Sequence, residues 1–177
     1  MKKLLFCLTL VLAVFSVNAQ SGVSFDKSTS YLHAGIGFGG GFYSGSITLP
    51  PISLSYEKAV TDKISVGGIV GYSSSKYSYG FGGSSYDWKY TYLLIGARGN
   101  YHFATTEKFD PYAGLTLGYN IVSVKSPGEV RGYAAKGSAL LFGAQVGANY
   151  YFSSNTGAFA ELGYGIGILT IGLTAKL

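Results

Sequence analysis

The sequence has very little cysteine and little charge. Its one cysteine, Cys7, precedes residue 20. The remainder of the chain therefore cannot form disulfides, thiolate metal sites or a cysteine nucleophile. Charged residues make up 12% of the chain, about half of the ~25% that is typical of soluble domains. After residue 20 there is also no apolar run that approaches the ~20 residues of a membrane-spanning helix.

The first 19 residues predict a secretory signal peptide. Lys2 and Lys3 precede an almost unbroken apolar run over residues 4–17, and a Val-Asn-Ala sequence ending at Ala19 suits signal peptidase. We therefore expect residues 1–19 to be removed and residues 20–177 to form one domain. An N-terminal anchor helix is the disfavoured alternative, because the apolar run is shorter than the ~20 residues that span a bilayer.

Net charge gives no indication of nucleic-acid binding. The formal charge of +5 falls to +3 once Lys2 and Lys3 are removed. The remaining basic residues are scattered along the chain and form no basic stripe of the kind found on nucleic-acid-binding surfaces.

Glycine and aromatic residues are abundant, with 27 Gly, 16 Tyr and 11 Phe. Helical periodicity is absent, and each glycine inside a helix would cost ~1 kcal/mol. Apolar and small or polar residues instead alternate with period two, in stretches typical of barrel strands. This pattern predicts eight strands, at residues 31–39, 51–59, 63–73, 88–103, 111–122, 138–152, 158–165 and 168–177.

The predicted connections alternate in length. Long loops are expected at residues 40–50, 74–87 and 123–137, and short turns at 61–62, 104–110 and 153–156, with a tight glycine turn at 165–167. Bacterial barrels place long loops outside the cell and short turns in the periplasm. An eight-stranded barrel with both termini in the periplasm has that order.

The composition of the polar strand face favours a membrane barrel over a soluble one. A soluble barrel buries its apolar face and exposes the other to water, where many Lys and Glu are expected. Here the polar face holds mostly Gly, Ser, Thr and Asn, which suit the narrow interior of an eight-stranded barrel. Aromatic residues also fall near the strand ends, where interfacial girdles lie: Tyr56, Tyr101, Tyr150 and Phe152 near short turns, and Tyr72, Trp88 and Tyr119 near long loops. A soluble periplasmic or secreted barrel is the remaining alternative.

Several segments resemble the small outer-membrane β-barrel family common in Bacteroidota, which shares the architecture of the OmpA-type transmembrane domain. They are residues 52–57 (ISLSYE), 94–103 (LIGARGNYHF), 110–114 (DPYAG) and 159–165 (FAELGYG). The ending GLTAKL is similar to the terminal strand that the barrel-insertion machinery reads, although it ends in Leu177 in place of the usual aromatic residue. The resemblance implies a bacterial outer-membrane location and an all-β, eight-stranded up-and-down transmembrane barrel. It implies no single activity.

Charged residues on the inward face form the first candidate site. Glu57, Arg98 and Glu161 share that face with Gln145 and Asn149. A charge buried in a narrow barrel is costly unless it is paired, so we expect Arg98 to pair with Glu57, Glu161 or both. The pairing can act as a structural plug, which we favour, or as a selectivity element in a pore.

Catalytic motifs are not evident. His33 and His102 are the two histidines, and we interpret them as structural or interfacial. The sequence has no HExxH or GxSxG motif, and Gly39-Gly40-Gly41 lacks the lysine and helix of a phosphate loop. We therefore expect no catalytic residue, cofactor or metal, and the protein is not expected to be an enzyme. A lipid-modifying barrel enzyme is the most remote of the hypotheses.

The second candidate site is a set of aromatic residues between 73 and 92 in a predicted outer loop. Exposed aromatics bind glycans or proteins, although they can also cap the barrel mouth. In the third loop Lys125, Arg131 and Lys136 are candidates for contacts with lipopolysaccharide phosphates, although they can equally be solvated loop charges. The candidate surface-binding aromatics are Tyr77, Tyr79, Phe81, Tyr86 and Trp88.

The sequence therefore predicts a non-enzymatic outer-membrane barrel, with a plugged polar interior and a structural or surface-interaction role in the envelope. The main alternative is a narrow porin-like channel for ions or small solutes. Expected partners are outer-membrane lipid, lipopolysaccharide and the barrel-insertion machinery, with no nucleic acid, and the chain is expected to be a monomer.

Overall fold

The structure, a computed structural model, describes residues 27–39, 46–81, 84–103, 106–125 and 136–177. Side chains are not described for residues 79–81, 84–86 and 136. The expected signal peptide at residues 1–19 lies outside the described residues. In the described ranges no helix is long and apolar enough to cross a membrane.

The chain forms a closed antiparallel barrel in which each strand pairs with its neighbours in sequence and β1 pairs with β8. All eight predicted strands are present, which confirms the predicted fold class. The strands are β1 (Ser30–Phe38), β2 (Ser46–Ala59), β3 (Ile64–Phe81), β4 (Ser84–His102), β5 (Phe109–Lys125), β6 (Lys136–Tyr151), β7 (Thr156–Gly163) and β8 (Leu169–Lys176).

Alternate residues of each strand face opposite sides of the wall, as the period-two pattern predicts. On β5, Leu115 and Leu117 are 54% and 52% exposed, whereas Thr116 between them is 6% exposed. The same alternation leaves large apolar side chains on the outside of every strand. Water would solvate such a surface poorly, so this outer band is suited to lipid.

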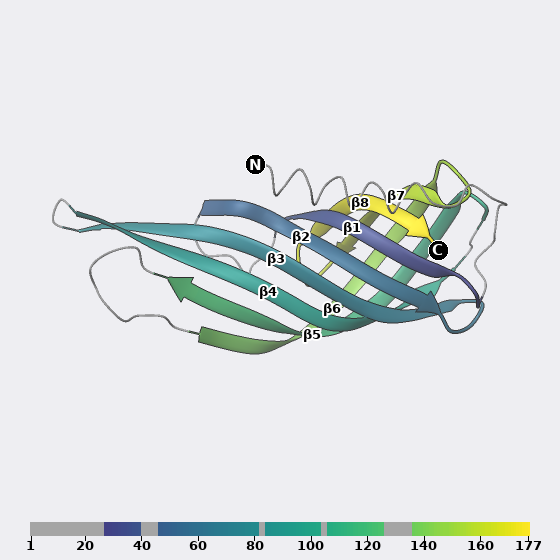
Figure 1. Cartoon of the computed structure of the whole chain (residues 1–177), viewed down its shortest axis with the longest axis horizontal. Coiled ribbons are helices and arrows are strands. Elements are labelled where there is room, and N and C mark those ends of the chain that lie inside the picture. The colour runs from purple at the N-terminus through teal and green to yellow at the C-terminus, as the bar shows by residue number, and fades with distance from the viewer. Residues whose placement is uncertain (1–26, 40–45, 82–83, 104–105, 126–135) are drawn as a thin grey trace.

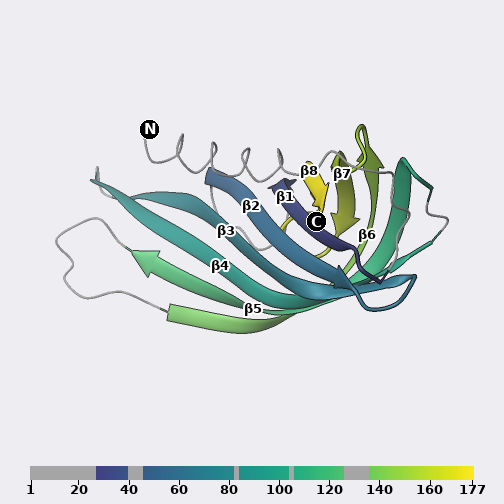
Figure 2. The ribbon, with the colours of Figure 1, turned by 45° about the vertical axis from the view of Figure 1, so that its right-hand side comes forward.

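The two ends of the barrel differ. We call the end that holds Ser30 and Lys176 the terminal end, and the opposite end the hairpin end. Strands β3 and β4 have 18 and 19 residues, whereas β7 and β8 have 8 each. Figures 1 and 2 show β3 and β4 reaching far beyond the short strands β1, β7 and β8. The wall at the hairpin end is therefore tall on one side and low on the other.

Three predicted loops are wrong in extent. Of the loop expected at 123–137, residues 123–125 belong to β5 and residues 136 and 137 to β6, while Arg131 lies outside the described residues. Residues 74–87 were expected to form a loop, but β3 and β4 continue pairing through them to the Phe81–Ser84 pair. Likewise β2 begins at Ser46, inside the loop expected at 40–50. Outward residues of the extended hairpin, such as Lys76 and Asp87, are polar, so these stretches lack the apolar alternation that marks a strand within lipid.

Candidate functional site

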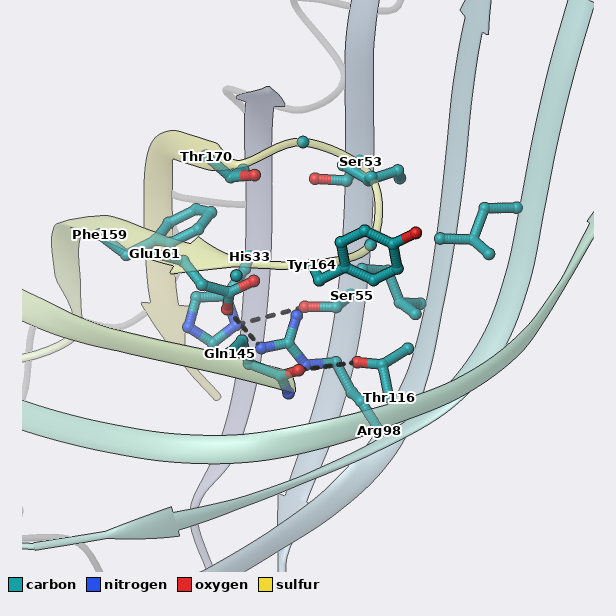
Figure 3. A pocket seen from close by; sticks show the side chains of 16 residues that line it. His33, Ser53, Ser55, Arg98, Thr116, Gln145, Phe159, Glu161, Tyr164 and Thr170 are labelled. Atoms are coloured by element: carbon teal, nitrogen blue, oxygen red, sulfur yellow. Dashed lines mark hydrogen bonds and ion pairs between the residues drawn. The ribbon is translucent and has the colours of Figure 1, made fainter. Parts of the chain in front are cut away.

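The barrel interior brings together the three charged residues that the sequence singles out. Arg98 of β4 lies between two carboxylates, and its Nη2 donates to Glu161 Oε2 of β7 at 2.6 Å. Arg98 Nε lies 2.9 Å from Glu57 Oε1 of β2, an ion pair whose atoms are not aligned for a hydrogen bond. Figure 3 shows the guanidinium extending toward Glu161 across the interior. Arg98 and Glu57 are buried, at 6% and 1% exposure, so each charge depends on its partner.

Uncharged side chains also donate hydrogen bonds to one oxygen of each carboxylate. Glu57 Oε2 accepts from the Ser65 hydroxyl at 2.6 Å and from Asn100 Nδ2 at 2.8 Å. Glu161 Oε2 accepts from the Tyr112 hydroxyl at 2.9 Å. These donors come from β3, β4 and β5, so the interior links opposite sides of the barrel. Charge-assisted hydrogen bonds of this kind are stronger than neutral ones.

A second branch of the network fills the terminal end. Asn149 Nδ2 donates to Asp110 Oδ2 at 3.0 Å, and His33 Nε2 lies 3.0 Å from Asn149 Oδ1, where it donates to the amide oxygen. Rings pack around this branch, with the Tyr31 and His102 centroids 5.5 Å apart. The interior is therefore occupied by both polar and aromatic side chains.

A link between the two branches is present that the sequence does not predict. His102 Nδ1 lies 2.8 Å from Asp110 Oδ1, and its Nε2 lies 3.0 Å from Ser65 Oγ. This is the connectivity of a serine-hydrolase triad, but its environment is wrong for hydrolysis. The Ser65 hydroxyl gives its single proton to Glu57, and the three residues are 0–3% exposed and line neither of the two lumen cavities. The three side chains therefore connect β3, β4 and β5 inside the barrel.

The segment joining β7 to β8 enters the lumen, although the sequence predicted a simple tight turn there. Its Ile166 side chain reaches toward β3, where a Cβ on Gly71 would overlap it. Gly143 of β6 gives similar room, because a Cβ there would overlap the Tyr164 carbonyl oxygen. The Tyr164 amide donates to the Ala144 carbonyl at 2.9 Å. Missing side chains on two strands thus let this segment fold inward.

Two small cavities lie in the described part of the lumen. One cavity of about 30 Å³ lies among His33, Arg98 and Glu161, and another of about 20 Å³ lies beside Tyr92 and Leu141. Ile166 lines both, so it stands at the boundary between them. A water molecule needs roughly 10–15 Å³ of such space, so the larger cavity has room for about two or three waters and the smaller for about one or two.

The predicted surface aromatics lie on the β3–β4 hairpin and not in a loop. Tyr77 pairs with Trp88 and Tyr79 with Tyr86 in the strand register, while Phe81 pairs with Ser84. Tyr77 is 45% exposed. Trp88 has the same parity along β4 as the inward-facing Arg98, so it lies on the concave face, and its predicted place in the lipid-facing girdle is wrong. The five aromatic positions therefore share one face of the hairpin.

Comparisons with known proteins agree with this architecture. The profile of the family described as "Outer membrane protein beta-barrel domain" matches residues 7–173. The N-terminal β-barrel domain of Pseudomonas aeruginosa OprF is similar over 86% of this chain and 98% of that chain, with a TM-score of 0.57 and 16% identity. This likeness concerns the fold alone.

Two further solved structures are more distant. Neisserial surface protein A matches over 84% of this chain and 90% of its own, with a TM-score of 0.49 and 18% identity. Ail of Yersinia pestis, in complex with the heparin analogue sucrose octasulfate, matches over 84% of this chain and 91% of its own, with a TM-score of 0.49 and 13% identity. No curated protein is significantly similar in sequence to this chain. Because the family profile covers nearly the whole chain, the chain belongs to the outer membrane protein beta-barrel domain family and is an integral β-barrel of the bacterial outer membrane.

Proposed function

We propose that this protein is a non-enzymatic outer-membrane barrel with a plugged interior, acting in a structural or surface-interaction role at the cell surface. The observation that carries the proposal is the buried network around Arg98, Glu57 and Glu161, which crosses the lumen between β2, β4 and β7. All three charges have an ion-pair partner, which favours a fixed interior. If one of these side chains moved away, a buried charge would lose its partner.

The lumen is narrow even beyond that network. Ile166 stands between two cavities of about 30 and 20 Å³, and neither is large enough for a hydrated ion with its shell of waters. This favours the plug over the narrow channel that the sequence left as an alternative. The burial of Ser65, His102 and Asp110 likewise speaks against an acyl-transfer role.

The test is ion conductance through purified protein in planar lipid bilayers. We expect no single-channel steps from the folded wild-type barrel, whereas a general porin reconstituted in the same way should conduct. Regular conductance steps from preparations shown to be folded by their heat-dependent gel mobility would contradict the plugged interior and restore the channel hypothesis.

The surface role is proposed for the aromatic face of the β3–β4 hairpin. Bacterial barrels keep their termini in the periplasm, so the hairpin end should face outward from the cell. Tyr77 and Trp88 would then offer flat apolar surfaces beyond the membrane, with Ser75 and Tyr90 paired directly below them. Trp88 is the one tryptophan of the chain, so its fluorescence would report any glycan or protein that docks there.

A further inference from the structure

We propose that Lys76, Lys89 and Lys125 form a lysine row that binds the phosphate groups of lipids in the leaflet at the hairpin end. The inference rests on the membrane location of the barrel. It does not depend on the plugged interior or on the aromatic face of the hairpin, because the row lies on the opposite, outward face of the wall.

The strand register aligns the three lysines. Lys76 of β3 is directly opposite Lys89 of β4, and Lys89 is directly opposite Lys125 of β5. All three side chains are exposed. Nothing in the sequence spacing reveals this row, because it arises from the pairing of three strands. A fourth lysine, Lys136 of β6, is placed by the register opposite Ser123, two residue pairs closer to the apolar band.

The row lies at the height of lipid head groups. Tyr72, Leu93 and Ile121 form the last apolar row of the outer band, and each lysine is four residues beyond one of them. Four residues rise ~13 Å along a strand, or about 10 Å along the membrane normal at the usual tilt. The polar region of a leaflet is about 5–8 Å thick, and lysine stems bend back along apolar surface. The ammonium groups therefore reach the phosphate layer.

The described residues balance only part of the charge along the row. Like charges directly opposite one another destabilise a sheet. Asp87 relieves part of this, since its Oδ2 lies 2.6 Å from Lys76 Nζ while its Oδ1 accepts from the Ser78 hydroxyl. Among the described residues, no carboxylate lies within ion-pair distance of Lys89 or Lys125. Within the described part of the chain, two exposed cations therefore remain next to a lipid surface, and a phosphate group is the anion that such a surface supplies.

Neighbouring side chains favour phosphate binding as well. Thr91 and Ser123 lie between the lysine row and the apolar band. They pair with each other and are partly exposed. Their hydroxyl groups can donate hydrogen bonds to phosphate oxygens while the lysines supply charge. The surface is continuous with the lipid-facing band, so the occupant is a membrane lipid that presents its phosphate at this height.

The experiment measures binding of fluorescent diphosphoryl lipid A to folded protein in neutral detergent micelles, with dephosphorylated lipid A for comparison. Wild type should prefer the phosphorylated lipid, and added salt should weaken binding. The variant Lys89→Gln/Lys125→Gln should bind about thirtyfold more weakly, roughly fivefold for each lysine removed. The matched control, Lys58→Gln/Lys63→Gln, removes two exposed lysines at the terminal end and should bind as wild type does.

Three results would overturn the proposal: equal binding of both lipids by wild type, undiminished binding by the Lys89/Lys125 variant, or an equal loss in the Lys58/Lys63 control. If the glutamine variant fails to fold, Lys89→Arg/Lys125→Arg keeps the charges and should retain the preference for phosphate. Loss of that preference in the folded arginine variant would also count against the row.

Discussion

Replacing Arg98 with methionine is expected to lower the free energy of unfolding by about 3–5 kcal/mol. The substitution removes the cation that lies 2.6 Å from Glu161 and 2.9 Å from Glu57. Both carboxylates would stay inside the barrel, with Glu57 only 1% exposed. The cost arises from the uncompensated buried charges and not from lost packing, since methionine retains much of the side-chain volume.

The measurement is urea-induced unfolding in phospholipid vesicles. In the triple variant Arg98→Met/Glu57→Gln/Glu161→Gln most of the lost stability should return, because no buried charge remains and the amides keep oxygens for their Ser65, Asn100 and Tyr112 donors. Lys63→Met, an exposed position, should change stability by less than about 0.5 kcal/mol. A triple variant as unstable as the single one would show that charge pairing is not what Arg98 contributes.

Introducing arginine at Leu115 is expected to destabilise the barrel by about 2–4 kcal/mol, because this position lies at the middle of the outer band. The apolar outer residues of β5 extend from Phe109 to Ile121, and Leu115 is at their centre. An arginine there would face the centre of the hydrocarbon layer. In a soluble barrel of the opposite arrangement the same position would be packed in the core, and the protein would be found free in the periplasm.

The matched substitution is Ser123→Arg, on the same strand and face but beyond the apolar band. It should cost about 0–1 kcal/mol, since the penalty for a cation falls near the interface. Urea unfolding in vesicles again provides the measurement. Equal costs at the two positions would mean that the depth of the residue does not matter, contrary to a lipid-facing surface.

Strand number and the direction of each side chain follow from the sequence because lipid imposes a simple alternation. Leu115, Thr116 and Leu117 show it directly, and the inward placement of Glu57, Arg98 and Glu161 follows from the same rule. Lipid imposes this constraint only within the bilayer. Beyond Tyr72 the outward residues of β3 are polar, among them Lys76 and Ser78. The sequence therefore has no apolar alternation there from which the continued pairing of β3 and β4 could be predicted.

Other features depend on contacts between distant strands. Ile166 enters the lumen because Gly71, on a strand nearly a hundred residues earlier in the sequence, leaves room for it. The connection from Ser65 through His102 to Asp110 depends on three strands. The alternation of each strand places Ser65, His102 and Asp110 in the lumen. Which of them contact one another depends on the register between strands, and neither the composition nor the period-two pattern specifies that register.

The side chains that touch lipid distinguish this barrel from one with its apolar face inside, and spin labelling in bilayers identifies them directly. Single cysteines can be placed at residues 115–117 of β5 and 144–146 of β6, because residues 20–177 contain no cysteine of their own. Collision with membrane-dissolved oxygen should be frequent for labels at Leu115, Leu117, Ala144 and Val146, and infrequent at Thr116 and Gln145. The opposite pattern would contradict a barrel whose apolar face is turned to lipid. In that case the labels at Thr116 and Gln145 would be accessible to oxygen and those at the two leucines would be protected.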